Sequence, residues 1–313
     1  MTAEPARSGN GRVIVVGSAN ADLVVQAPRH PKPGETILGT DFAVHRGGKG
    51  ANQAVAASRA GAEVWMIGRL GNDVNAELLR SGLREDRVGD KFVGNCKHDP
   101  SGTALITVDA GGENTIVVVP GSNALLRPVH VDDAAEAGVF ASAKVVLAQL
   151  EVPLDCVKTG FEHGRKNSTI NVLNAAPARE LAADVLALVD VLVVNEHELA
   201  LVTGTQDREA ALIGARAHVR WVALTLGSLG ARLVGPETDV AVAAHKVQVV
   251  DTTGAGDAFC GAFCAALAAG QTMEQSLFEA NAAGALATTR AGAQPSLPDA
   301  NEIAQLLRDE ALS

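Results

Sequence analysis

The stretch with the clearest chemical potential is Asp251-Thr-Thr-Gly-Ala-Gly-Asp257, which joins a β-branched run, Val247–Val250, to an apolar, alanine-rich segment of helical composition. The backbone N–H groups of Gly254–Gly256 would converge at the N-terminus of this helix, where an anion is stabilised. Asp257 would lie in the first helical turn. Its carboxylate could accept a proton from a hydroxyl group while the neighbouring amides stabilise a transferring phosphoryl group. The alternative is an aspartate that only caps the helix.

A second glycine-rich turn, residues 46–52, also leads into a helical segment. Gly48 permits close approach of the backbone to a ligand, and Lys49 offers a cation. Asn52 can both donate and accept hydrogen bonds, which suits a polyol. A tight turn with a surface lysine would have the same composition, so this motif alone leaves both interpretations open.

Two polar residues, Asn20 and Asp22, follow the first apolar run, Val13–Val16. In an extended segment, residues two apart point to the same side, so this amide and this carboxylate could bind vicinal hydroxyls together. Turn formation alone would explain both residues equally well.

Three common site motifs do not fit the sequence. A dinucleotide fingerprint would need a third glycine where Phe259 stands, and few residues follow Asp257, which leaves a dehydrogenase as a weak alternative. The sequence has no Gly-x-x-x-x-Gly-Lys-Ser/Thr motif, so a P-loop is excluded. The eight histidines show no His-x-x-x-His or similar spacing, and we expect no tightly bound zinc.

The composition argues against nucleic acid and membrane as partners. The chain has 313 residues with 26 Lys and Arg against 36 Asp and Glu, a formal charge of −10, and only seven Phe and two Trp could stack on bases. The longest apolar stretch, Ala258–Ala269, is too short to cross a bilayer. Cys96, Cys156, Cys260 and Cys264 match neither a zinc module nor a disulfide framework, so we expect a cytoplasmic protein with reduced thiols.

Short β-branched runs alternate with segments of helical periodicity along most of the chain. This alternation predicts parallel strands joined by crossover helices, hence an α/β layered fold. The predicted strands are Val13–Val16, Val64–Ile67, Val145–Leu150, Ser168–Leu173, Val189–Val194 and Val222–Leu226. The predicted helices are Ala51–Ala60, Ala76–Leu83, Arg179–Leu188, Glu209–His218 and a last helix with Ser296 as its N-cap.

Two segments break the alternation. Thr103–Val108 and Thr115–Val119 flank a Gly-rich turn and predict a β-hairpin, while the Pro-containing segment Leu23–Ala43 predicts short strands and turns. We expect both to form a small second sheet that serves as a lid, a dimer contact or both. The predicted organisation is a disordered tail at residues 1–11 and one α/β domain at residues 12–313, with lid segments at about 23–46 and 102–120.

Taken together, these stretches resemble the ribokinase-like (PfkB) family of sugar and nucleoside kinases, over nearly the whole chain from Val13 to Pro298. Residues 251–257 resemble the C-terminal signature of that family, and residues 47–57 resemble its N-terminal signature. Three shorter motifs are similar to the ribokinase branch in particular: Gly17-Ser-Ala-Asn-Ala-Asp22, Pro33-Gly-Glu-Thr36 and Gly292-Ala-Gln-Pro-Ser296.

The resemblance implies the reaction ATP + D-ribose → ADP + D-ribose 5-phosphate on a three-layer fold, with a mostly parallel central sheet of about eight or nine strands, flanking helices and a β lid. It implies that Asp257 deprotonates the 5-hydroxyl and that the amides of Ala255 and Gly256, after Gly254, form the anion hole. It also implies Mg²⁺ bound with ATP, K⁺ as a monovalent activator, and a homodimer formed through the lid.

Residue by residue, the resemblance assigns three groups. The sugar set is Asn20, Asp22, Gly48, Lys49, Asn52, Glu151 and Asp257. The nucleotide and magnesium set is Asn195, Glu198, Thr225, Gly227, Ser228, Gly230, Gly256 and Asn281. The potassium set, which acts largely through backbone carbonyls, is Asp251, Thr253, Ala287, Arg290, Gly292 and Ser296. From the residues alone, Asn195 and Glu198 could instead form a helix capping box. Glu151 could be an ordinary loop carboxylate, and Arg290 a cation at a helix end.

Three other functions stay open at this point. A kinase for 2-deoxyribose or another pentose could differ by one substrate hydroxyl, which the sequence does not resolve. A nucleoside kinase fits the same fold, although Asn20, Asp22 and residues 47–52 follow the ribokinase pattern. A non-catalytic sensor of sugar or nucleotide could also use the fold, because a fold alone does not establish activity.

Overall fold

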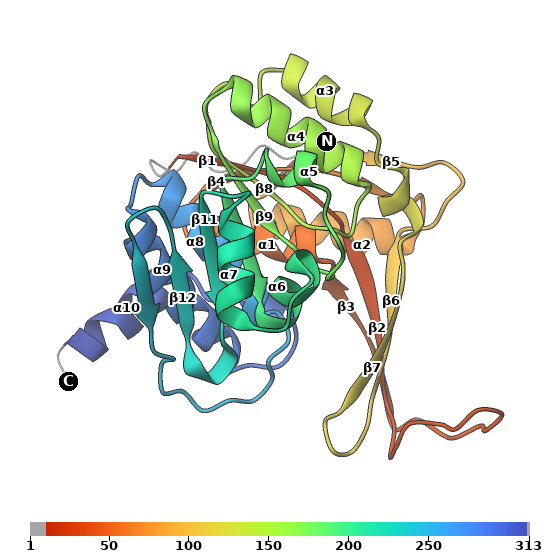
Figure 1. Cartoon of the computed structure of the whole chain (residues 1–313). Coiled ribbons are helices and arrows are strands. Elements are labelled where there is room, and N and C mark those ends of the chain that lie inside the picture. The colour runs from red at the N-terminus through yellow and green to blue at the C-terminus, as the bar shows by residue number, and fades with distance from the viewer. Residues whose placement is uncertain (1–10, 312–313) are drawn as a thin grey trace.

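The computed structural model describes residues 11–311 and has a nine-stranded main sheet with helices on both faces, as the family resemblance implies (Figure 1). The strands of this sheet are β1 (Arg12–Val16), β4 (Glu63–Leu70), β5 (Gly89–Asn95), β8 (Ala143–Ala148), β9 (Ile170–Asn174), β10 (Val191–Asn195), β11 (Trp221–Thr225), β12 (Ala231–Val234) and β13 (Asp239–Val242). Their order is β13-β12-β11-β10-β9-β8-β1-β4-β5. All neighbours are parallel except β11–β12 and β12–β13.

Helices cover both faces of the main sheet. One face carries α1 (Lys49–Arg59), α2 (Val74–Glu85), α8 (Ala255–Ala268), α9 (Met273–Ala287) and α10 (Ala300–Ala311). The other carries α3 (Pro128–Glu136), α4 (Leu154–Lys166), α5 (Ala183–Leu186), α6 (Glu196–Thr203) and α7 (Arg208–Arg216). Short 3-10 helices are η1 (Gly121–Leu125), η2 (Gly227–Leu229) and η3 (Gln294–Ser296). Within residues 11–311, no helix is both long and apolar enough to cross a membrane.

The main sheet has a hydrophobic core on each face, and strand β1 contributes to both. Val13 and Val15 are fully buried in the core beneath α1 and α8, while Ile14 and Val16 are fully buried in the core on the α4 side. Alternate residues of a strand point to opposite faces, and a central parallel strand buries both, so β1 reads as a continuous apolar run. The sheet therefore forms a rigid base for the loops at its edges.

Helices α1 and α8 pack unusually close to each other. A Cβ at Gly261, in the middle of α8, would lie 2.6 Å from the backbone N of Ala57 in α1. Only glycine permits this approach, because any side chain would clash with backbone. The contact brings the first turn of α8 against the first turns of α1, the two helices that follow the glycine-rich motifs.

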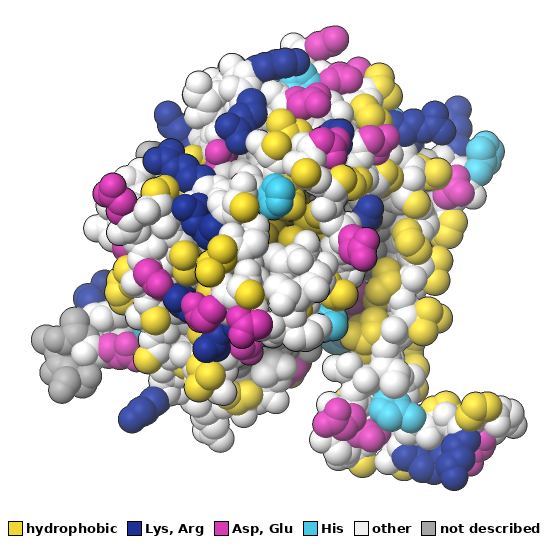
Figure 2. All heavy atoms as spheres, viewed as in Figure 1, with side chains coloured by type: hydrophobic (Ala, Val, Ile, Leu, Met, Phe, Trp, Pro, Cys, Tyr) yellow, Lys and Arg dark blue, Asp and Glu magenta, His cyan; other side chains and the backbone are white. Residues whose placement is uncertain are grey.

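The second sheet has four strands, β2 (Asn20–Gln26), β3 (Asp41–Gly47), β6 (Gly102–Val108) and β7 (Asn114–Val119), in the order β3-β2-β6-β7. It projects from the body beside the main sheet and confirms the expected hairpin and second sheet (Figure 1). Hydrophobic side chains run along it, and charged side chains gather at its tip (Figure 2). We call this sheet the lid.

The helix predicted at Arg179–Leu188 is wrong in extent, because only α5 forms there. Val185 and Leu186 are buried, whereas residues 177–184 are exposed or partly exposed. Most of the stability of a short helix comes from packing an apolar face, so the earlier residues have too little burial to hold helical turns.

The β-branched run Val247–Val250, which precedes the glycine-rich turn, forms no strand, and Val249 and Val250 are more than half exposed. One other prediction at the C-terminal side differs from the structure. Ser296 does not cap the last helix: it lies in η3 and donates to the carbonyl of Ala293, while Asp299 Oδ1 accepts from the backbone N of Glu302 at 3.0 Å. An aspartate one residue before the helix is the better cap. Of the predicted disordered tail, residues 1–11, all but Gly11 lie outside the described residues.

The carboxyl ends of β1, β8, β9 and β10 lie along one edge of the main sheet, because these strands are parallel neighbours. β1 lies between β8 and β4, where the strand order changes direction. In open α/β sheets the crevice outside such a point is the usual ligand site.

Candidate active site

A cavity of about 680 Å³ lies at this edge, between the strand ends and the lid. It brings together the whole predicted sugar set with the start of α8. Its polar lining is Asn20, Asp22, Gly48, Lys49, Asn52, Asn123, Glu151, Thr253, Gly254 and Asp257. Its apolar wall comes mainly from the lid and the loop after β8, through Ile106, Ile116, Val118, Leu150, Val152 and Pro153.

Asp257 lies in the first turn of α8 and is 9% exposed. Both of its carboxylate oxygens accept hydrogen bonds from α1: Oδ2 from Asn52 Nδ2 and Oδ1 from Gln53 Nε2, each at 2.9 Å. Burial raises the pKa of Asp257, and the charge of Lys49 and these two hydrogen bonds oppose that rise. The result is a fixed, buried carboxylate with a raised pKa, which suits a general base more than a helix cap.

Lys49 and Glu151 form the second charged element of the cavity. Glu151 Oε2 accepts from the backbone N of Lys49 at 3.0 Å and from Ser18 Oγ at 2.5 Å, so Glu151 caps the start of α1. Burial lowers the pKa of Lys49, but the charges of Asp257 and Glu151 outweigh it and the pKa is raised. Lys49 therefore stays a cation between carboxylates.

Asn20 and Asp22 lie at the start of β2, where it leaves the main body for the lid. Asn20 Oδ1 accepts from Asn123 Nδ2 at 2.7 Å, which directs the donor end of Asn20 away from Asn123. Asp22 contacts the backbone of β3: a Cβ at Gly47 would lie 2.0 Å from Asp22 Oδ2. Desolvation, followed by the charges of Glu151 and Asp257, raises the pKa of Asp22 to about 7.

The glycine-rich turn before α8 has the geometry of an anion site. Gly254 has φ 79°, in the left-handed region, and α8 begins at Ala255. Around Gly256 a Cβ would meet nothing within 4 Å, so its backbone faces open space. The N–H of Ala255 donates to the carbonyl of Thr252 at 3.3 Å, a long bond that a phosphoryl oxygen could replace. The first-turn amides of α8 are therefore available to an anion.

Apart from Gly256 in the first turn of α8, the predicted nucleotide set lies at the ends of β10 and β11, in the segments that follow them and on α9, outside the residues that line this cavity. Asn195 and Glu198 form the capping box of α6, with Glu198 Oε2 accepting from the N of Asn195 at 2.9 Å. The pKa of Glu198 is raised by burial, and Lys49 and Asp257 both act on it, so α6 faces the same charges. In the parallel pair β10–β11, Asn195 lies opposite Thr225. Gly227 and Ser228 lie in η2 and are exposed.

Two members of this set are already engaged with backbone. Asn281, 7% exposed, donates to the carbonyl of Ala243 at 2.9 Å, so its amide holds the chain after β13. Gly230 has φ 100°, and a Cβ there would lie 1.9 Å from the carbonyl O of Val242. These contacts place the loop after β11 and the chain after β13 together over α9.

The predicted potassium set spans two loops that Asp251 joins. Asp251 Oδ1 accepts from the N of Thr253 at 2.9 Å, and Oδ2 accepts from the N of Gly292 at 2.8 Å. Burial raises the pKa of Asp251, but these hydrogen bonds outweigh it and the pKa is lowered. Ala287 ends α9, while the hydroxyl of Ser296 donates to the carbonyl of Ala293. The side chain of Arg290 forms a salt bridge with Glu302 in α10.

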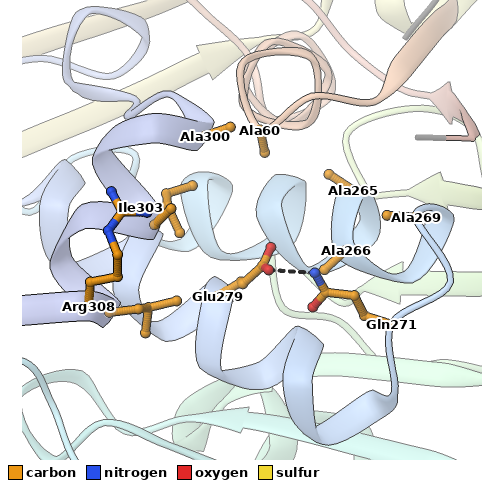
Figure 3. A pocket seen from close by; sticks show the side chains of 11 residues that line it. Ala60, Ala265, Ala266, Ala269, Gln271, Glu279, Ala300, Ile303 and Arg308 are labelled. Carbon is orange, nitrogen blue, oxygen red and sulfur yellow. Dashed lines mark hydrogen bonds between the residues drawn. The ribbon is translucent and has the colours of Figure 1, made fainter. Parts of the chain in front are cut away.

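A second cavity, of about 360 Å³, lies between α8, α9 and α10, far from these residues (Figure 3). Its walls are mainly alanines with Ile303 and Leu307. Its one carboxylate, Glu279, accepts a hydrogen bond from Gln271 at 2.6 Å. Besides Glu279, the cavity is lined by the cation of Arg308, and no residue of the predicted sets lies in it.

Three residues of the site were missed by sequence reasoning: Ser18, Gln53 and Asn123. Each is less than 2% exposed and orients a predicted residue, Glu151, Asp257 or Asn20 respectively. Ser18 and Gln53 lie inside the motifs that carry the resemblance, so their position was a usable signal. Asn123 lies in η1 and no local pattern distinguishes it.

Known proteins match the chain along nearly its whole length. It matches the family described as pfkB family carbohydrate kinase over residues 10–300. Ribokinase from Bacillus subtilis is 38% identical over 297 residues, which cover 94% of this chain and 99% of that protein. Deoxyribokinase from Salmonella typhimurium is 34% identical over 302 residues, which cover 94% and 98%. The chain spans only 57% of a bifunctional ribokinase/ribose-5-phosphate isomerase A from Fructilactobacillus sanfranciscensis, at 34% identity over 310 residues.

A solved structure agrees with this match. Arabidopsis thaliana ribokinase complexed with ribose and ATP superposes with a TM-score of 0.89 at 32% identity, covering 95% of this chain and 99% of that chain.

Proposed function

The chain belongs to the pfkB family of carbohydrate kinases, and we propose that it is a ribokinase, which transfers the γ-phosphoryl group of ATP to the 5-hydroxyl of D-ribose. The observation that carries this proposal is the position of Asp257. Its buried carboxylate lies in one cavity with the amides and carboxylates of Asn20, Asp22 and Glu151, and directly beside the glycine turn of α8.

In the proposed mechanism, Asp257 accepts the proton of the 5-hydroxyl as its oxygen attacks the γ-phosphorus. The bond between this phosphorus and the β,γ-bridging oxygen breaks, and ADP leaves. The amides of Ala255 and Gly256 stabilise the charge on the transferring group, since they lie at the positive end of α8. The lid residues Ile106 and Ile116 close over the sugar and exclude water from the reacting oxygen.

The remaining sugar-set residues orient the substrate. Asn20, Asp22 and Glu151 supply donors and acceptors for ring hydroxyls, and Gly48 lets the backbone approach the ring. Lys49 neutralises part of the negative charge of Asp257, Glu151 and Glu198, and so prepares the cavity for an anionic phosphoryl group.

For ATP and its Mg²⁺, the proposed contacts are Asn195, Glu198, Thr225, Gly227, Ser228, Gly230 and Asn281. The capping box occupies Glu198 Oε2 and leaves Oε1 as a hard oxygen that suits hydrated Mg²⁺. The exposed backbone of Gly227 and Ser228 offers an open surface to the nucleotide. Mg²⁺ supplies charge neutralisation between the phosphates when bound.

For K⁺, the proposed residues are Asp251, Thr253, Ala287, Arg290, Gly292 and Ser296, of which Arg290 contributes only its carbonyl. Asp251 accepts hydrogen bonds from the backbone N of Thr253 and of Gly292, which holds the two loops next to each other. Turnover should be several times faster in K⁺ than in Na⁺ at equal ionic strength. Equal rates in the two salts would remove the site.

The substrate is tested by ADP release with ATP and Mg²⁺, using D-ribose and 2-deoxyribose side by side in K⁺ buffer. We expect D-ribose to be preferred, because a site built to bind a 2-hydroxyl leaves its polar groups unpaired when that hydroxyl is missing. Preference for 2-deoxyribose would keep the mechanism and replace the substrate, as the similarity to a deoxyribokinase makes a specific alternative. Binding of ribose without ADP production would indicate a sensor instead.

The assembly we propose is a homodimer formed through the lid. Phe42, Leu105 and Val117 are 49–62% exposed on the lid, and neighbouring exposed apolar side chains of this kind often mark an interface between proteins. Light scattering at micromolar concentration should give twice the mass of 32.1 kDa, and a monomer would refute the dimer.

Within each subunit, we propose that residues 12–313 act as one kinase domain. We also place the protein in the cytoplasm, because its four cysteines are buried and unpaired.

A further inference from the structure

A chain of buried amides lies behind Asp257, on the side away from the cavity. Gln149, just after β8, donates from Nε2 to Gln53 Oε1 at 2.6 Å. Gln53 Nε2 in turn donates to Asp257 Oδ1 and to Asn174 Oδ1, each at 2.9 Å. Gln149 and Gln53 are fully buried, and Asn174 at the end of β9 is 8% exposed.

The direction of these hydrogen bonds depends on Gln149. A side-chain amide has a donor end and an acceptor end, and Gln53 presents its donor end to the carboxylate of Asp257. If Gln53 turned over, Oε1 would face the oxygens of Asp257 and Asn174, with no proton between them. Because Gln149 already donates to Gln53 Oε1, turning over would also break that bond.

We propose that Gln149 is a positioning residue for the phosphoryl transfer, which acts through Gln53 to keep a hydrogen-bond donor on the Asp257 carboxylate. The relay runs from Gln149 to Gln53 to Asp257 and links the end of β8 to the base across α1. This inference rests on the proposed function, since it takes Asp257 as the base.

Packing at the strand ends supports a dedicated place for Gln149. A Cβ at Gly17, just after β1, would lie 2.3 Å from Gln149 Oε1, so glycine leaves the room that this amide needs. Gln149 Oε1 has no hydrogen-bond partner in the part of the chain that the structure describes. A buried unpaired polar atom is costly, and a methionine or leucine would fill the space without it. The advantage of glutamine at position 149 is therefore the hydrogen bond that its Nε2 donates to Gln53.

The relay acts on the charge of Asp257 together with other groups that face it. These groups are Lys49 on α1, Glu151 after β8, Asp22 on β2, Glu198 on α6 and Cys260 one turn along α8. The hydrogen bond from Gln53 lowers the pKa of Asp257 against the rise caused by burial. Loss of the relay should therefore raise that pKa further.

The test is the pH profile of kcat for Gln149→Met, which removes the donor at nearly constant volume. We expect the acidic limb to move up by about one unit, because hydrogen bonds to charged groups are worth that much, so kcat should fall up to roughly tenfold below the limb and recover above it. The KM for the sugar should stay unchanged. Asn171→Met is the matched control: it removes a fully buried amide from β9 that bonds to Phe161 and Leu188, and it should leave the profile unmoved.

Two additions separate the relay from folding and from the reaction. Gln149→Asn keeps a buried amide that is one methylene too short to reach Gln53, and it should shift the profile in the same direction. In the protein without substrates, ¹³C NMR of the Asp257 carboxyl, assigned by its loss in Asp257→Ala, should give a higher titration midpoint in both variants. A moved midpoint with no kinase activity on any sugar would overturn the proposed function but not the relay. An unmoved midpoint, or an equal loss of kcat at every pH, would overturn the relay.

Discussion

Replacing Asp257 with alanine should lower kcat by about three orders of magnitude while the protein stays folded. A positioned general base contributes on the order of 10²–10⁴-fold to proton transfer, and no other carboxylate replaces it beside the turn at Gly254. The KM values for sugar and ATP should change little, because Asn20, Asp22 and the loops after β10 and β11 remain in place. Steady-state kinetics with the preferred sugar measures all three constants.

Stability should move in the opposite direction to activity. The raised pKa of Asp257 means that ionisation costs the folded state free energy, so its contribution to stability is present below the unfolded value of 3.8 and is lost as the pH rises through the folded pKa. The alanine variant lacks this loss. Its Tm relative to wild type should therefore increase from pH 4 to pH 8, offset in part by the unpaired donors of Asn52 and Gln53.

Asp184→Ala is the matched control, because Asp184 is an exposed carboxylate on α5 whose salt bridge is with Lys158. It should leave kcat within twofold of wild type, as surface substitutions usually do. Turnover near the wild-type rate in Asp257→Ala would refute the assignment of the base. Loss of activity with a large fall in Tm would mean that the variant reports on folding instead.

The sequence predicted the parts of the site that have local signatures. The turn at Gly254 and the motif around Lys49 depend on residue types at fixed spacing, and each leads into a helix beside the cavity. The main sheet was predictable for the same reason, since β1 must be apolar on both faces to lie in its centre. The length of a helix was harder to predict. Helix α5 is short because residues 177–184 bury little surface, and the periodicity of the sequence does not reveal this.

What the sequence did not reveal are the contacts between distant segments. Gln53 reaches Asp257 across 204 positions of the chain, and Asn123 reaches Asn20 across 103. Such pairs follow from how α1, α8 and the lid pack, and no local rule encodes them. Gln149 was the nearest to a visible signal, because a glutamine in the apolar run before Glu151 has to find a buried partner.

The affinity for the sugar should depend on pH through Asp22. Its pKa of about 7 has three causes, in order desolvation, the charge of Glu151 and the charge of Asp257. As an acceptor for ring hydroxyls, Asp22 acts best when ionised, and at pH 6 only about a tenth of the molecules carry that charge. Sugar binding without ATP should therefore be roughly tenfold weaker at pH 6 than at pH 8.

Calorimetry distinguishes this effect from the titration of Asp257. If the sugar prefers the ionised form of Asp22, binding at pH 6 must release a proton, so the measured enthalpy will change with the ionisation enthalpy of the buffer. At pH 8, where Asp22 is already ionised, the buffer should have little effect. ATP binding should show neither behaviour, because Asp22 lies in the sugar cavity and the nucleotide set lies outside it.

The Asp22→Asn variant tests the same pH dependence by removing the carboxyl group that titrates. The asparagine does not titrate, so sugar binding should be weak at both pH values and should release no proton. The wild-type fold loses stability as the pH rises from about 4 to about 7, through the raised pKa of Asp22, and this part of the slope should be missing in the variant. Equal sugar affinity at pH 6 and pH 8 in the wild-type protein would mean that Asp22 is not the acceptor. Strand β2 would then couple the lid to the site through Asn20 and its partner Asn123 alone.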